Sequence, residues 1–239
     1  CVYMDIHQLE EPLPVHLAQA LCYGYMYCCD HENVNTITIQ ITYCNLETEE
    51  IRRLKQDKTR EELETWFQGL IHEYVKWAEY LYRHTLRRDE SLRELEFPYK
   101  YRAGQKELAV SVYRALARKR NLFIQAPTGI GKTLSVVYPS LKSMGNGNGE
   151  KLFYLTAKTI TRSVAESCFS LLRERGMLFT TVTITAKEKL CPLEKTECNP
   201  DVCPYAKGHF DRVNDAVFDI LHEQQGITRE MILDYAEKY

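Results

Sequence analysis

The sequence has no long uncharged apolar run. The longest weakly charged segment, residues 13–29, still contains His16, Gln19 and Gly24 together with three tyrosines. This composition is typical of a buried helix, because a membrane span needs about 20 predominantly apolar residues. We therefore expect no membrane partner.

A secretion signal is also missing from the start of the chain, and the nine cysteines are odd in number. A disulfide framework needs an oxidising compartment and normally pairs its thiols evenly. These absences predict free thiols and a reducing, cytoplasmic location. The chain begins at Cys1 without an initiator methionine or a helix cap, so we expect a piece of a longer protein.

The net charge is only −2 over 239 residues, but the charged residues are distributed unevenly along the chain. Residues 1–96 contain 10 Lys and Arg against 18 Asp and Glu, whereas residues 97–239 contain 21 against 15. Only the second part is basic enough to favour a polyanion such as DNA. Two solvated surfaces of different charge explain the same numbers equally well. With 44% hydrophobic residues the chain can bury a core, as one large or two small domains.

The strongest chemical signal lies in residues 122–133, where a short apolar run meets a glycine-rich turn that ends in Gly-Lys-Thr. Such a turn directs backbone N–H groups at one anion, and the following helix adds the positive end of its dipole. Lys132 would reach the β and γ phosphates of ATP, and the Thr133 hydroxyl would hold Mg²⁺. Ala126 replaces the usual first glycine, but a methyl group need not block the site. The predicted phosphate loop comprises Ala126, Pro127, Thr128, Gly129, Ile130, Gly131, Lys132 and Thr133.

Strands and helices are predicted to alternate around this loop. This pattern favours an α/β fold with a parallel sheet, right-handed crossovers and the loop at the carboxyl end of a strand. The expected strands are 122–125, 151–156 and 178–185, and the expected helices around them include 97–117 and 160–173.

Residues 1–95 show weaker patterns. Residues 36–45 alternate as a half-exposed strand, and residues 59–82 have the spacing of an amphipathic helix that begins with a Thr59–Glu62 capping box. Residues 83–96 are charged and are expected to end this helix and form a linker, so we place a domain boundary near residue 95. The side chains predicted to form the core stripe of the helix are Leu63, Trp66, Phe67, Leu70, Ile71, Tyr74, Ala78 and Leu81.

A helix over residues 15–29 would place Gln19, Tyr23 and Tyr27 on one face. An aromatic core stripe explains this spacing. The run Pro-Val-His-Leu-Ala-Gln-Ala-Leu-Cys-Tyr-Gly-Tyr that begins at Pro14 also resembles the Gln-x-x-x-Tyr segment of PD-(D/E)xK nucleases of the RecB and Cas4 type. That resemblance implies a partial α+β nuclease-like domain over residues 1–95.

The acidic residues of a nuclease centre are not found in the chain. In the nuclease family the metal-binding Asp and a Glu-x-Lys pair precede this helix, which here places them before Cys1. Asp5, Glu10 and Glu11 do not form such a pair. We therefore assign no nuclease centre.

Three cysteines, Cys191, Cys198 and Cys203, lie within thirteen residues of a proline-containing loop. This spacing in a loop favours thiolates offered to a metal over the alternative of scattered buried cysteines. Three ligands leave a metal site one short. His209 can complete a Cys₃His zinc site, and Cys168 is a further candidate.

The phosphate loop, the cysteines, an Arg102-x-x-Gln105 element and residues 155–159 together resemble the first motor domain of XPD/DinG-type superfamily 2 DNA helicases. The resemblance implies a RecA-like P-loop fold over residues 96–239, with an iron–sulfur insertion over about 187–239. It implies a 4Fe-4S cluster whose first three ligands are these three cysteines. The fourth ligand, preferred over His209, is then expected after a helix over 227–238 and just past Tyr239.

The same resemblance implies ATP-driven 5′ to 3′ unwinding in DNA repair, on single-stranded or forked DNA. It implies an adenine contact for Gln105 and contacts of Thr156 and Lys158 with the DNA backbone, although Lys158 is equally explained as a solvated lysine. No Asp-Glu-x-His element or second motor domain is present, so the chain alone is expected to bind ATP and hydrolyse little of it. The alternatives are a P-loop ATPase with a structural zinc knuckle and a DNA-binding module without motor activity. Protein partners and oligomeric state are not predicted.

Overall fold

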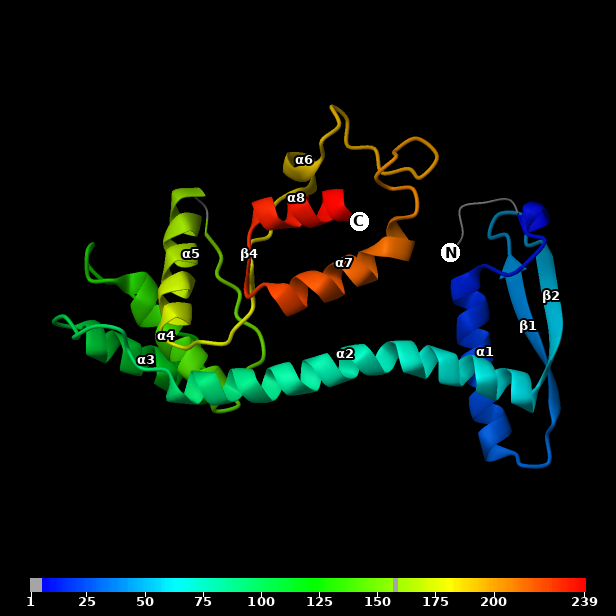
Figure 1. Cartoon of the computed structure of the whole chain (residues 1–239), viewed down its shortest axis with the longest axis horizontal. Helices are drawn as coiled ribbons and strands as arrows, with labels where there is room; N and C mark the ends of the chain where they lie inside the picture. The colour runs from blue at the N-terminus through cyan, green and yellow to red at the C-terminus, as the bar shows by residue number, and fades with distance from the viewer. Residues whose placement is uncertain (1–5, 157–158) are drawn as a thin grey trace. The chain divides into compact units, whose positions relative to one another are not determined.

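The computed structural model describes residues 6–156 and 159–239, so the predicted DNA contact Lys158 lies outside the described residues (Figure 1). The chain divides into two compact units, Cys1–Tyr80 (unit 1) and Leu81–Tyr239 (unit 2). This division falls inside one long helix, whereas the sequence places a domain boundary near residue 95.

Unit 1 is built on an antiparallel hairpin. Strand β1 (Thr36–Cys44) pairs with β2 (Ile51–Thr59) along its full length, so that Ile41 faces Leu54. Helix α1 (Pro14–Asp30) contacts β1, and a short 3₁₀ helix, η1 (Ile6–Gln8), contacts β2. The N-terminal part of α2 (Arg60–Glu94) completes the unit. The residues buried between α1, β1 and α2 are Leu21, Cys28, Ile39 and Leu63.

The predicted start of α2 is confirmed by its hydrogen bonds. The backbone N–H of Thr59 donates to Glu62 Oε2 at 2.8 Å, and the backbone N–H of Glu62 donates to Thr59 Oγ1 at 3.2 Å. This reciprocal pair satisfies donors that the first helical turn leaves open, and it lowers the pKa of Glu62. The strand over 36–45 is confirmed as β1. β2 was not predicted, because its four basic residues obscure the apolar alternation.

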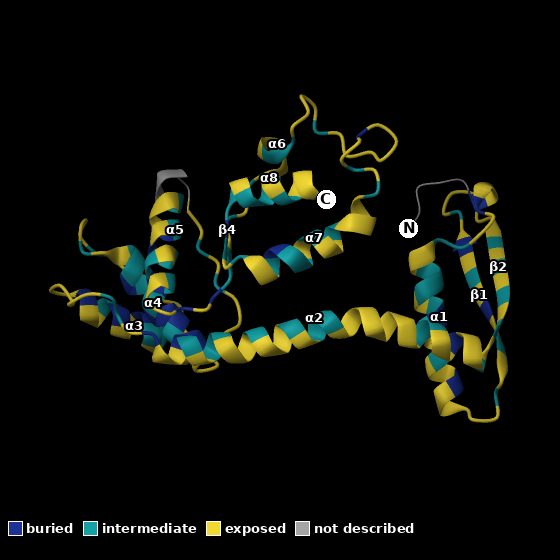
Figure 2. Cartoon of the chain, in the orientation of Figure 1, coloured by how far each residue is buried: buried dark blue, intermediate teal, exposed yellow. Residues whose placement is uncertain are grey.

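The predicted core stripe of α2 is wrong over the middle of the helix. Leu63 is fully buried, but Leu70, Tyr74 and Leu81 are 43%, 61% and 57% exposed (Figure 2). Helical spacing identifies a shared face and does not say what covers it. In the described residues, only the first turns of α2 pack into the core of unit 1.

The aromatic face of α1 is not a core stripe either. Tyr23 and Tyr27 are 62% and 50% exposed, and Gln19 Nε2 donates to the Tyr23 hydroxyl at 3.3 Å. The opposite face, which carries Leu21 and Cys28, is the one that packs on β1. The stripe therefore marks the outer face of this helix in the described structure.

Unit 2 is mainly helical, and one core joins its central helices. Nine residues form this core: Leu92, Leu95, Val137, Leu141, Met144, Cys168, Leu172, Met177 and Phe179. They come from the end of α2, from α4 and α5, and from the segment after α5. The other unit 2 elements are α3 (Gln105–Ala117), α4 (Lys132–Gly145), α5 (Thr159–Glu174), β3 (Thr181–Val182), α6 (Lys187–Leu190), α7 (His209–Glu223), β4 (Gly226–Ile227) and α8 (Arg229–Lys238).

Of the predicted parallel sheet, the described residues contain one pair of two-residue strands. β3 pairs in parallel with β4, with Thr181 opposite Gly226. Residues 122–125 and 151–156 were predicted as strands but form none, and Phe123 and Leu155 are 96% and 88% exposed. A strand needs a neighbouring strand to complete its backbone hydrogen bonds, and in the described residues neither segment is part of a sheet. The expected helices are confirmed, although α3 begins only at Gln105.

The C-terminal ends of α2 and α4 cap each other. Arg93 Nη1 donates to the carbonyl oxygen of Gly145 at 2.9 Å, and Lys142 donates to the carbonyl oxygen of Arg93. The Tyr138 hydroxyl donates to Leu95 O at 3.2 Å. These bonds satisfy carbonyl groups that a helix end leaves without partners. Burial raises the pKa of Tyr138 to about 12.

Among the described residues, none of the helices combines the length and the hydropathy that a membrane span requires.

The close approach of α2 and α4 gives a first prediction. A Cβ atom on Gly145 would lie 2.8 Å from Leu92 Cβ and 2.9 Å from the backbone nitrogen of Arg93. Replacing glycine by alanine in an exposed helix normally stabilises it by up to about 1 kcal/mol. We expect Gly145→Ala to do the opposite and to lower the free energy of unfolding by about 1–3 kcal/mol, because the two helices must separate.

Urea denaturation followed by circular dichroism measures this difference. Gly69→Ala is the matched control, because Gly69 lies in α2 and nothing lies within 4 Å of the place that an added methyl group would take. Equal effects of the two substitutions would contradict the close packing at Gly145.

Candidate nucleotide-binding site

The phosphate loop, residues 126–133, has the backbone conformation that its glycines allow. Gly129 and Gly131 have φ angles of +84° and +82°, in the left-handed region that other residues rarely adopt. α4 begins at Lys132, directly after Gly131. The loop therefore stands at the N-terminus of a fourteen-residue helix, where the helix dipole and free N–H groups favour an anion.

Lys132 closes the loop on itself. Its Nζ donates to the carbonyl oxygens of Ala126 and Pro127 at 2.9 and 3.0 Å. The Thr133 hydroxyl lies 3.4 Å from the hydroxyl of Tyr154. A bound triphosphate would offer Lys132 stronger, charged acceptors in place of these carbonyls. The two residues predicted to touch phosphate and Mg²⁺ thus lie together at the start of α4.

A turn formed by residues 102–105, which we call the support turn, lies against the loop. Arg102 Nη1 donates to Gly129 O at 2.6 Å. Gln105 is 5% exposed, and its Oε1 accepts from the backbone N–H of Arg102 at 3.0 Å. A methyl group on Gly131 would lie 2.8 Å from Gln105 Nε2. The structure thus brings the predicted Gln105 directly beneath the loop.

The predicted metal ligands are not gathered in the same way. Cys203 is 4% exposed, whereas Cys191 is half-buried and Cys198 is exposed. Within residues 6–156 and 159–239, no three His, Cys, Asp or Glu side chains are close enough together to hold a metal ion. The pKa of Lys187 is raised, chiefly by hydrogen bonding with the Cys198 side chain.

The other two candidate ligands do not complete the group. Cys168 lies in the core of unit 2, where burial raises the pKa of its thiol to about 11. His209 is exposed at the first position of α7. As arranged in the described residues, the cysteine segment does not fit a metal centre.

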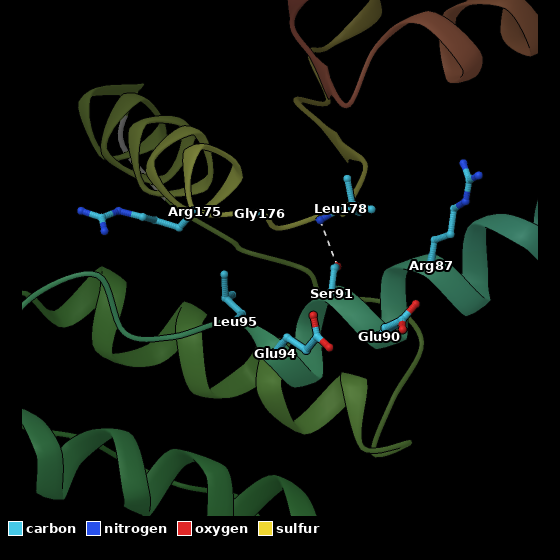
Figure 3. A pocket seen from close by; sticks show the side chains of 8 residues that line it. All are labelled: Arg87, Glu90, Ser91, Glu94, Leu95, Arg175, Gly176 and Leu178. Atoms are coloured by element: carbon cyan, nitrogen blue, oxygen red, sulfur yellow. Dashed lines mark hydrogen bonds between the residues drawn. The ribbon is translucent and has the colours of Figure 1, made fainter.

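A cleft of about 500 Å³ lies elsewhere in unit 2 and shares no residue with the loop. The backbone N–H of Leu178 donates to Ser91 Oγ across it at 3.0 Å. Figure 3 shows the Arg87 and Arg175 side chains at opposite ends, pointing away from each other. The two guanidinium groups therefore do not converge on one anion. The lining residues are Arg87, Glu90, Ser91, Glu94, Leu95, Arg175, Gly176 and Leu178.

Comparison with known proteins is consistent with the geometry of the loop. Residues 105–222, which include the whole phosphate loop, match the family described as DEAD/DEAH box helicase. This match supports a helicase domain of superfamily 2, and such a domain implies a RecA-like P-loop fold. It does not distinguish the XPD/DinG iron–sulfur type and does not reach the predicted nuclease-like part.

A shorter stretch of the chain matches a relative that is also named as a helicase. A protein of Methanocaldococcus jannaschii named as a probable ATP-dependent helicase is 47% identical over 47 residues. The match covers 19% of this chain and 7% of the length of that protein. No solved structure significantly matches the chain.

Sequence reasoning identified the loop but missed part of what holds it. Arg102 enters the prediction only as part of a motif, and neither Gly104 nor Tyr154 has a predicted role. Gly104 has a φ of +77°, which brings the support turn up to the loop. A glycine directly before a helix start was the signal that could have identified this turn. The contacts across the loop come from residues distant in sequence, which no local pattern reveals.

The loop geometry predicts that substitution of Gly131 lowers both the stability of the fold and the affinity for nucleotide, whereas a similar substitution elsewhere lowers stability alone. Alanine at Gly131 must adopt a left-handed backbone, which costs about 1–2 kcal/mol, and must displace the Gln105 amide. Gly147→Ala is the matched control, because Gly147 has a φ of +81° with nothing within 4 Å of the added methyl. We expect both variants to lose similar stability but only Gly131→Ala to lose affinity for a fluorescent ATP analogue. An unchanged affinity in Gly131→Ala would remove this glycine from the site.

Proposed function

We propose that this chain forms the nucleotide-binding part of an ATP-dependent DNA helicase. The observation that carries the proposal is the phosphate loop, whose two left-handed glycines lead into Lys132 at the start of α4. The loop lies within the residues that match the DEAD/DEAH box helicase family. The M. jannaschii relative supports ATP dependence through its name alone.

The geometry suggests how the loop would take ATP. Lys132 would transfer its hydrogen bonds from Ala126 O and Pro127 O to phosphate oxygens. Mg²⁺, when bound, would neutralise phosphate charge, and the Thr133 hydroxyl is the ligand that this chain offers it. Backbone N–H groups at the start of α4 would complete the phosphate contacts. These groups bind and orient the triphosphate, whereas hydrolysis needs further groups, so we propose that the chain alone hydrolyses little ATP.

The finer features of the proposal rest on sequence resemblance. They are 5′ to 3′ polarity, a role in DNA repair, single-stranded or forked DNA as partner, and a nuclease-like origin of unit 1. The excess of basic residues in 97–239 supports a polyanionic partner. Thr156, which is exposed, remains a proposed contact with the DNA backbone. Cysteine usage supports a reducing, cytoplasmic compartment.

An iron–sulfur cluster on Cys191, Cys198 and Cys203 is also a proposal, and its support is the cysteine spacing together with the sequence resemblance to iron–sulfur helicases. In the described residues the three thiols are not close enough together to hold a metal ion, so binding of a cluster would require the cysteine segment to rearrange. We therefore assign the cluster no part in ATP binding. A structural zinc knuckle on the same cysteines is the competing proposal, which would make the protein a P-loop ATPase of another kind.

The lysine of the loop provides the direct test. Lys132→Ala removes the ammonium group from the phosphate site, and a hydrogen bond to a charged group contributes about 1.5–3 kcal/mol. We expect the affinity of the chain for ATP with Mg²⁺ to fall about 10- to 100-fold in isothermal titration calorimetry. Lys151→Ala, in the segment that follows α4, is the control. An Lys132→Ala variant that binds ATP as the unchanged chain does would contradict the proposed site.

Metal analysis decides between the two cysteine proposals. We expect full-length protein purified without oxygen to contain iron and acid-labile sulfide, and Cys198→Ser to lose both. Cys44→Ser, which removes an exposed thiol of unit 1, should leave the metal content unchanged. Stoichiometric zinc without sulfide would contradict the cluster and favour the zinc knuckle. Absence of both metals would contradict both proposals.

A further inference from the structure

The loop that follows α4 contains the same reactive pair of residues twice. Asn146 precedes Gly147 and Asn148 precedes Gly149, whereas none of the other asparagines in the sequence precedes a glycine. The backbone nitrogen of the next residue can attack an asparagine side chain, and glycine hinders this attack least because it has no side chain. We propose that Asn148 is a site of spontaneous deamidation in the folded chain, and that the end of α4 protects Asn146. This inference is independent of the proposed function.

The reaction needs only this chain and water. The Gly149 nitrogen forms a bond to Cγ of Asn148 while the bond from Cγ to Nδ2 breaks. The side-chain nitrogen leaves as ammonia with the hydrogen of the Gly149 N–H, and a five-membered cyclic imide remains. Water then opens one of the two C–N bonds of the imide, which gives aspartate or isoaspartate. Asparagine counts among the thermolabile residues.

The end of α4 is closed by a Schellman motif. Gly147 has a φ of +81°, and its backbone N–H donates to Met144 O at 2.8 Å. The backbone N–H of Asn148 donates to Ser143 O at 3.0 Å. This pair of bonds around a left-handed glycine satisfies carbonyl groups that the last turn of a helix leaves without partners. The first of the two Asn-Gly pairs therefore lies inside the motif.

Both reacting groups of the first pair are held. The backbone of Asn146 has φ −97° and ψ 17°, and its Nδ2 donates to Lys142 O at 2.8 Å. To attack Cγ of Asn146, the Gly147 nitrogen must give up its hydrogen bond to Met144 O and turn toward the side chain. The attacking nitrogen and the leaving amide are thus both engaged in hydrogen bonds that the reaction must break.

The second pair follows the motif and is not held in this way. Asn148 and Gly149 are exposed. Within residues 6–156 and 159–239, neither the Asn148 side chain nor the Gly149 N–H has a hydrogen-bond partner. Turning the Gly149 nitrogen toward Cγ of Asn148 breaks neither bond of the motif. The structure therefore distinguishes two positions that the sequence presents as equivalent.

Deamidation at Asn148 changes the segment directly after α4. The product carries a carboxylate where the amide was neutral, and it lies beyond the end of the helix at which the dipole is also negative. Isoaspartate in addition places one more methylene group in the backbone between residues 148 and 149. Aged protein is thus a mixture of chains that differ in charge and backbone length at this one position.

The experiment incubates the folded 239-residue chain at mildly alkaline pH and measures released ammonia over time. Tandem mass spectrometry of the tryptic peptide 143–151 then separates the two positions, and a sample digested before incubation corrects for reaction during digestion. We expect aspartate and isoaspartate to form at Asn148 at least about 10-fold faster than at Asn146, because hydrogen bonds protect only Asn146. In a sample unfolded in guanidinium chloride, the two positions should react at similar rates.

Two matched variants assign the ammonia to its source. Asn148→Gln keeps an amide but would have to form a six-membered ring, so we expect it to remove most of the ammonia release. Asn146→Gln should leave the release nearly unchanged, and circular dichroism confirms that each variant is folded. Reaction at Asn146 as fast as at Asn148 in the folded chain would overturn the inference. An Asn148→Gln variant that releases ammonia as the unchanged chain does would also overturn it.

Discussion

The mutual capping of α2 and α4 is the contact on which the rest of unit 2 depends. Arg93 binds the last carbonyl of α4, while Lys142 and Tyr138 bind the last carbonyls at the end of α2. The backbones approach this closely because Gly145 has no side chain. Polar groups at both helix ends are thereby satisfied at the edge of a core that contains several leucine and methionine side chains.

This junction matters for the nucleotide site because α4 has the junction at one end and Lys132 at the other. Ser135 Oγ donates to Gly131 O at 2.9 Å, which ties the first turn of α4 to the loop. At the same time the Lys132 ammonium group donates to two loop carbonyl oxygens, whose partial negative charge faces it. A lysine beside the positive end of a helix would otherwise be repelled, so the closed loop is a stable arrangement before a phosphate arrives.

The helices and the turn before α4 could be predicted from sequence, whereas two of the expected strands, β2 and the long-range contacts could not. The capping box at Thr59 and the Gly-Lys-Thr turn are short patterns whose chemistry is complete within a few residues. The contact of Arg102 with Gly129 joins positions far apart in sequence, and only the fold brings them together.

Periodicity misled where packing was inferred from spacing alone. Tyr23 and Tyr74 lie on regular helical faces but remain exposed, since a stripe does not specify a partner. The three cysteines show the same limit. Their spacing suggests one centre, but spacing along a loop does not fix where the sulfur atoms point.

The extended residues 122–125 and 151–156 have one more consequence. Both segments carry exposed aromatic or aliphatic side chains, such as Phe123 and Leu155, beside backbone groups that no described strand pairs. Segments of this kind are templates for strand addition, and at high concentration the partner can come from a second molecule. The stretch that leads into the phosphate loop therefore combines exposed apolar side chains with the extended backbone on which strand addition depends.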